Sequence, residues 1–132
     1  MNLTARVLLT CLTCLIIVPE ALAKKPAAQR AVAVTGVFEN FTVGKGSGDL
    51  EGMRVVLVAA GGGHYAIVQI AQGGAEDPKP EWVPVKVKGN TVNFTVGDEK
   101  FNGTVTSAGL RLKRSSGESQ LLKRKPCSSY FG

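Results

Sequence analysis

The sequence has few of the residues on which enzyme active sites and metal centres are usually built. Its 132 residues include one histidine, three cysteines and one tryptophan. The single histidine, His64, follows three glycines, a position typical of an exposed turn. No serine-nucleophile elbow, zinc-protease helix or metal-spaced cluster occurs. These absences argue against a catalytic role, and we expect neither a metal nor a cofactor.

Only one of the three cysteines, Cys127, lies outside the N-terminal apolar segment. Cys11 and Cys14 lie within the apolar run 7–18, which is shorter than the roughly 20 residues that span a bilayer. This run ends near the small residues before Ala23, as in a secretory signal peptide. After cleavage at that point only Cys127 remains, so we expect export without an internal disulfide. The composition suits the periplasm or the medium of a bacterium.

The expected organisation is a single domain with short flanking segments. It comprises a signal peptide (1–23), a flexible linker (24–31), one folded domain (32–126) and a C-terminal tail (127–132). The formal net charge is +6, and the signal peptide removes one charge of each sign, Arg6 and Glu20, so the mature chain keeps it. A basic exported protein favours acidic lipids, acidic glycans or an acidic protein as partners, whereas nucleic acid is not expected there.

The mature chain also lacks the helical spacing of apolar residues, which leaves strands as its elements. The clearest unit is residues 82–97, where valine alternates with polar residues on both sides of Gly89 and Asn90. A two-residue hairpin turn at that pair sets the register. It predicts three inward pairs: Val87 with Val92, Val85 with Phe94, and Val83 with Val96.

Further segments alternate in the same way and predict about eight antiparallel strands in all. Such a meander hides its apolar face by closing on itself, so we expect an all-β, closed or nearly closed barrel. The outward positions are polar where lipid would require apolar residues, which argues against a membrane barrel. Those positions are Lys86, Lys88, Asn93, Thr95, Lys100, Asn102, Thr104, Arg111 and Lys113.

Several short motifs lie at the expected turns and strands. They are Gly36, the Gly89-Asn90-Thr91-Val92-x-Phe94 turn, Phe101-x-Gly103-Thr104-Val105 with Gly109-Leu110, and Leu122-Lys123-Arg124. In these features the chain resembles the short, exported, lipocalin-like (calycin-like) β-barrel proteins of bacteria. The resemblance implies a non-enzymatic barrel. It departs from true lipocalins at Gly36-Val37-Phe38, where those proteins carry Gly-x-Trp.

The hairpin 53–72 is apolar on both faces. Assuming a turn through Gly61, Gly62 and Gly63, we place Val56, Val58, Ala66, Val68 and Ile70 on one face. The other face then carries four apolar residues that either lie under the tail or proline loop, or form an exposed patch for self-association or a partner. They are Val55, Leu57, Tyr65 and Ile67.

Trp82 falls on the outward side of its strand, together with Lys86 and Lys88. An exposed indole beside two ammonium groups is suited to a glycan, an anionic headgroup or a protein partner. In the predicted register Trp82 also faces Gly97, and an aromatic ring that covers a strand glycine is a structural device. Both interpretations stay open at this stage.

The C-terminal hairpin concentrates positive charge and forms a second candidate surface. Edge protection and solubility explain this charge, and an anion-binding face is the alternative. The basic residues are Arg111, Lys113, Arg114, Lys123, Arg124 and Lys125.

Together these patterns indicate an exported, non-enzymatic binding protein. One hypothesis is a small apolar or amphipathic ligand in, or at the mouth of, a lipocalin-like barrel. The alternative is a protein-interaction module of the envelope, such as an enzyme inhibitor that acts through its surface, and an enzyme ranks third. The interior volume separates the first two, because a barrel of this size can be filled by its own side chains.

Overall fold

The computed structural model describes residues 32–74 and 78–127. The expected signal peptide, the linker and most of the C-terminal tail lie outside these residues. Every regular element in the described part is a strand, and none of it forms a helix of the length and apolarity that a membrane crossing requires. The strands are β1 (Gly36–Glu39), β2 (Thr42–Val43), β3 (Leu50–Ala60), β4 (Gly63–Gln72), β5 (Glu81–Lys88), β6 (Thr91–Val96), β7 (Glu99–Thr106), β8 (Gly109–Arg114) and β9 (Ser119–Lys125).

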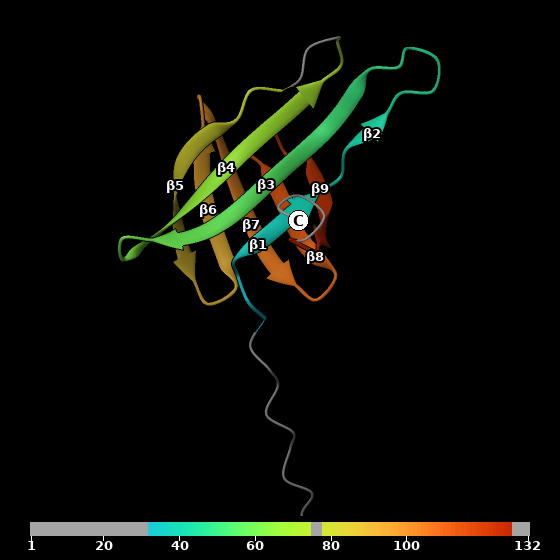
Figure 1. The fold of residues 1–132 in the computed structure, drawn as a ribbon. Coiled ribbons are helices and arrows are strands. Elements are labelled where there is room, and N and C mark those ends of the chain that lie inside the picture. Colours follow the sequence, from blue (N-terminus) through green and yellow to red (C-terminus); the bar gives the residue numbers. More distant parts are fainter. Residues whose placement is uncertain (1–31, 75–77, 128–132) are drawn as a thin grey trace, which may run out of the picture.

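The strands form a closed antiparallel barrel, as the alternation predicted (Figure 1). From β3 to β9 each strand pairs with its successor, and β1 closes the ring because it pairs with both β9 and β3. The ring has eight strands, and β2 is an additional strand that pairs with the start of β3. Closure removes the free sheet edges that an open meander of this kind would expose.

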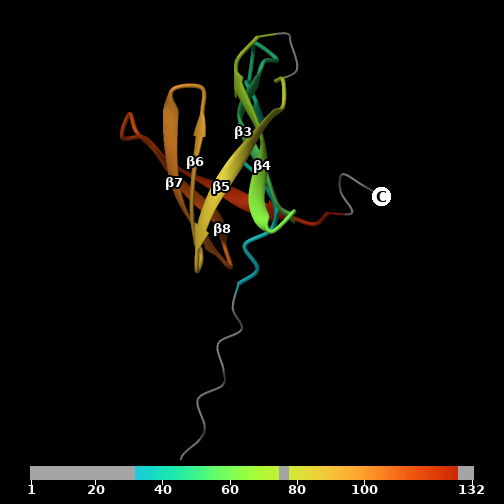
Figure 2. The same ribbon diagram turned by 90° about the vertical axis from the view of Figure 1, so that its left-hand side faces the viewer.

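Seen from the side, the barrel is flattened into two layers (Figure 2). β3 and β4 belong to one layer, β6 and β7 to the other, and β5 crosses from the first to the second. Its residues 81–85 pair with β4, and its residues 86–88 pair with β6. β5 is therefore the corner strand of the barrel.

The predicted register of the β5–β6 hairpin is confirmed next to its turn. Val87 lies opposite Val92, and Gly89 has a positive φ of 60°. Asn90 does not share that conformation; instead it donates a hydrogen bond from its amide to the carbonyl of Val105 on β7. The ladder ends at Lys86 and Asn93, so the two predicted pairs beyond them are absent from it.

The β3–β4 turn is one residue shorter than predicted, and this reverses a face. Only Gly61 and Gly62 form the turn, both at positive φ, while Gly63 already pairs with Ala60. Successive side chains of a strand point to opposite faces. A turn that is shorter by one residue therefore pairs each residue of β3 with a different residue of β4 and changes which residues share a face. Val55 is therefore opposite Val68, and Val56 is opposite Ile67.

The inward side chains form one apolar cluster that fills the barrel. All six inward positions predicted for β5 and β6 belong to it: five are buried, and Val87 is partly buried against the cluster. Phe38, Leu57 and Leu122 are exposed by 2% or less, so almost none of their surface is accessible to water. The cluster of buried residues is Phe38, Met53, Val55, Leu57, Ala66, Val68, Val83, Val85, Val92, Phe94, Val96, Phe101, Val105, Leu110, Leu112 and Leu122.

One end of the barrel is covered by Arg124 of β9. Its guanidinium lies 4.6 Å from the ring centroid of Phe38 and donates hydrogen bonds to the carbonyls of Ala33 and Thr35. This approach requires a glycine at position 36, which has a φ of +144° and whose Cβ would lie 2.5 Å from Arg124 Nη1. The chain before β1 is thereby held across this end.

Candidate functional site

The wall of the barrel is split between the first half of β5 and the second half of β6. Val83–Val85 pair with β4 and Phe94–Val96 pair with β7, but the β5–β6 ladder stops before either segment. Pro84 lies in the part of β5 that pairs with β4 on one side but not with β6 on the other. Proline has no N–H, so it is tolerated in a strand where one side makes no ladder.

This split is the place where the apolar core is least covered. Val83, Val85, Phe94 and Val96 keep between 5% and 8% of their surface exposed. Every other member of the core cluster is exposed by 2% or less. The four residues flank the split in pairs from β5 and β6. The apolar core is therefore most accessible at this side of the barrel wall.

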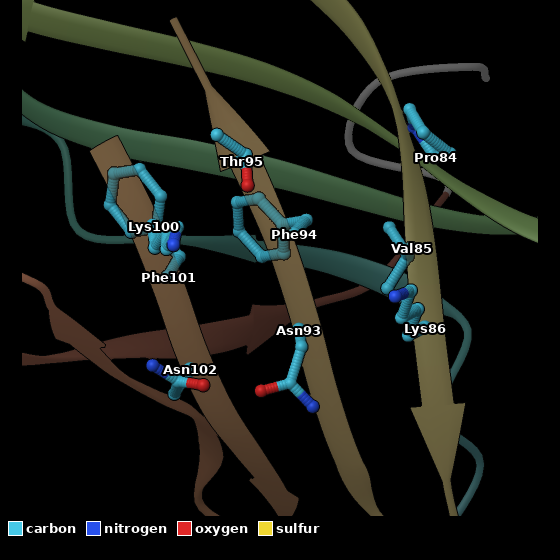
Figure 3. A pocket seen from close by; sticks show the side chains of 9 residues that line it. All are labelled: Pro84, Val85, Lys86, Asn93, Phe94, Thr95, Lys100, Phe101 and Asn102. Carbon is cyan, nitrogen blue, oxygen red and sulfur yellow. The ribbon is translucent and has the colours of Figure 1, made fainter. Parts of the chain in front are cut away.

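A hollow of about 420 Å³ lies over the split, a volume at the lower end of the range for small-molecule sites. Val85, Phe94 and Phe101 contribute apolar surface to it (Figure 3). The two phenylalanine rings are stacked, with centroids 5.2 Å apart and planes 12° apart. Arg114 lies 5.7 Å from the Phe101 centroid. Stacking of this kind holds the aromatic floor in one arrangement.

The rim of this hollow is polar and positively charged. Lys86 comes from β5 and Lys100 from β7, and both side chains are exposed. Asn93, Thr95 and Asn102 supply amide and hydroxyl groups between them (Figure 3). Apolar surface below and ammonium groups above together suit a molecule with an apolar body and an anionic or polar head.

Of the predicted aromatic and cationic site, only Lys86 lines the hollow. Trp82 is outward and 55% exposed, as its parity predicted, but it pairs with Ile67 of β4 and stacks on Tyr65 at 5.1 Å between centroids. The interpretation that it covers Gly97 is wrong, because a Cβ at Gly97 would have no heavy atom within 4 Å and the β5–β6 ladder does not pair the two residues. Lys88, although exposed, lies at the other end of β5 beside the hairpin turn.

The predicted patch on the β3–β4 hairpin is corrected by the shorter turn. Val55 and Leu57 point into the barrel and are exposed by 0% and 2%, so neither belongs to a surface patch. Tyr65 and Ile67 do face outward, and their partners on β3 are Val58 and Val56. The outward apolar surface therefore consists of Val56, Val58, Tyr65 and Ile67, beside Trp82 of β5.

The predicted basic face is also corrected, because its six residues lie in four different surroundings. Arg114 lies over the Phe101 ring and forms ion pairs with Glu99 and Glu118, each at 3.6 Å. Arg124 covers the opposite end of the barrel, as described above. Lys125 forms an ion pair with Glu39 at 3.3 Å. The other three side chains, which are outward and exposed, are Arg111, Lys113 and Lys123.

Sequence reasoning missed the split, although one signal pointed to it. Pro84 interrupts a strand that otherwise reads as a central one, and proline in a sheet indicates an edge or an irregularity. The contributions of Phe101 and Asn102 had no local signal, because β7 approaches the split through its pairing with β6.

The described residues contain no group of three or more His, Cys, Asp or Glu side chains placed to hold a metal ion. The chain matches no protein-family model, and no curated protein or solved structure is significantly similar to it.

Proposed function

We propose that this protein is an exported, non-enzymatic binding protein that takes a small amphipathic ligand through the split between β5 and β6. The observation that carries the proposal is the exposure pattern of the core. Its four partly accessible residues, Val83, Val85, Phe94 and Val96, all flank the split. The site differs from the barrel mouth considered from sequence, because one mouth is covered by Arg124.

The ligand places its apolar part against Val85 and Phe94, which keep 7% and 5% of their surface exposed, and its head between Lys86 and Lys100. The remaining interior is filled by side chains, so only a short apolar segment is accommodated without displacing the core. An anionic head is favoured over a cationic one, since both charged residues on this rim are lysines.

The proposal keeps the chain in the bacterial envelope or outside the cell and keeps its resemblance to lipocalin-like barrels. Phe38 stands where true lipocalins have tryptophan, and Arg124 packs over its ring.

A blocking substitution tests the site directly. Thr95→Trp adds a large ring at an exposed position that lines the hollow, and Thr106→Trp adds the same ring at the far end of β7. Calorimetric titration with dodecanoate is expected to show saturable, one-to-one binding to the unmodified protein and to Thr106→Trp, with affinity at least about tenfold weaker for Thr95→Trp.

Dodecyltrimethylammonium provides the matched control, because its chain has the same length and its head the opposite charge. We expect it to bind more weakly than dodecanoate. Equal binding of dodecanoate by the two tryptophan variants, or no saturable binding by the unmodified protein, would contradict the proposal.

A further inference from the structure

One wall of the barrel carries charge of a single sign on its outward side. We call it the cationic wall, formed by the second half of β5 with β6, β7 and β8. Among its outward strand positions, all of which lie in the described part of the chain, none is acidic and none is apolar. Apart from Gly109, these positions are Lys86, Lys88, Thr91, Asn93, Thr95, Lys100, Asn102, Thr104, Thr106, Arg111 and Lys113.

The acidic residue on these strands, Glu99, does not lie on the cationic wall. Glu99 begins β7 on the inward side, where it pairs with Arg114 at 3.6 Å. The cations of the wall therefore face solvent without an opposing carboxylate between them. Charges of one sign on one surface raise the local concentration of anions there.

The wall is grooved. The hollow over the split adjoins a second hollow of about 300 Å³, and Asn93 and Asn102 line both of them. Arg111 and Lys113 lie along the second hollow, as do Thr91, Thr104 and Ser119. Two hollows thus lie side by side across the strands from β5 to β8, and together we call them the groove. Lysine or arginine lies at each end, and amides and hydroxyls lie between.

We propose that this groove binds an acidic polysaccharide, one whose sugar units carry carboxylate or sulfate groups. The anionic groups pair with the cations at the two ends of the groove, and sugar hydroxyls exchange hydrogen bonds with the amides and threonines between them. An extended chain with repeated charges meets both ends at once, which a small anion does not.

Other polyanions fit this wall less well. Peripheral attachment to an anionic membrane normally combines basic residues with apolar side chains that enter the lipid, and the outward positions here offer none. Single-stranded nucleic acid is bound through exposed aromatic rings on which bases stack. The two aromatic rings at the groove, Phe94 and Phe101, are exposed by only 5% and 1%.

This inference goes beyond the proposed function and is tested apart from it. Arg111 and Lys113 line the second hollow and not the one over the split. Their replacement is therefore expected to leave dodecanoate binding unchanged. A lack of dodecanoate binding by the unmodified protein would therefore count against the proposed function alone, and a lack of polyanion binding by it would count against this inference alone.

The experiment compares two double variants that lose the same charge. Arg111→Ser/Lys113→Ser removes two cations from the groove, while Lys45→Ser/Lys79→Ser removes two exposed cations outside it. The probes are polygalacturonate and dextran sulfate, with neutral dextran as the uncharged control. At low ionic strength, we expect polyanion binding to weaken at least about tenfold in the first variant and less than about threefold in the second.

Charge-preserving replacement separates binding from folding. Arg111→Lys/Lys113→Arg is expected to bind polygalacturonate within about threefold of the unmodified protein. Equal losses in the two serine variants would overturn the proposal, as would neutral dextran binding equally well or no binding of either polyanion. Stronger binding to phosphatidylglycerol vesicles or to oligothymidylate would also overturn it, because the wall would then recognise a membrane or a nucleic acid.

Discussion

Trp82 shows how one outward residue joins two strands without belonging to the core. Its side chain is 55% exposed, and its ring lies 5.1 Å from that of Tyr65, with only 15° between the planes. This stacked pair belongs to the outward apolar surface. Its contribution to stability is limited, because most of the indole remains in water.

We therefore predict that Trp82→Ala lowers the free energy of unfolding by about 1 kcal/mol, the usual size of an exposed aromatic pair. Urea denaturation of Trp82→Ala, Tyr65→Ala and the double variant measures the coupling between the rings. We expect the double variant to lose less than the sum of the single losses. A loss of more than about 3 kcal/mol for Trp82→Ala would instead identify a core residue and remove it as a partner site.

At the level of elements, β5 determines where the barrel can be approached. A strand at the corner of two layers cannot keep full ladders with neighbours in both, so it pairs with β4 over its first half and with β6 over its second. The split is the consequence. Its apolar floor and lysine rim follow from the alternation of residues along the same strands.

Cysteine pairs test this geometry in a Cys127→Ser background. Lys86→Cys with Asn93→Cys places thiols on Cα partners of the ladder, and we expect a disulfide on mild oxidation. Pro84→Cys with Thr95→Cys follows the same register across the split, where Cα atoms farther apart than about 7 Å cannot be bridged. Mass spectrometry under non-reducing conditions is expected to detect the first disulfide only.

Equal disulfide yields would show that the ladder continues and that the split is closed. The first pair also serves as the control for strand flexibility, because it measures the yield expected of aligned strands.

For the whole molecule, closure of the barrel depends on β1, a strand of four residues between β3 and β9. Glu39 is the polar centre of this seam: its carboxylate lies 2.9 Å from Arg54 Nε on β3 and 3.3 Å from Lys125 Nζ on β9. The Glu39 side chain is only 12% exposed, so these ion pairs are partly shielded from water. Both neighbours of β1 are thus tied to it through one residue.

We predict that Glu39→Gln lowers the free energy of unfolding by about 1 to 3 kcal/mol, because hydrogen bonds to a charged, largely buried group are lost. Glu51→Gln removes the same charge from an exposed position of β3 and is expected to change stability by less than about 0.5 kcal/mol. Guanidinium denaturation measures both variants. Equal effects would show that the Glu39 ion pairs contribute nothing to closure.

Much of this architecture follows from the sequence by itself. Alternation determined the all-β class, the inward set from Val83 to Val96 and the polar outer wall, because each side chain of a strand must take one of two faces. The pair of Val87 and Val92 followed from the turn beside it. These are local relations, and local sequence specifies them.

Other features were decided only by the tertiary structure, because they depend on contacts between distant strands or on the exact length of a turn. Gly63 could belong to the turn or to the strand, and only the packing of Val55 and Leu57 into the core settles which side faces water. Likewise, parity turns Arg114 and Arg124 inward, but their contacts with Phe101 and Phe38 depend on strands that are distant in the sequence. The split exists because β5 passes from one layer to the other when the barrel closes. Closure involves all the strands, so no single segment of the sequence specifies it.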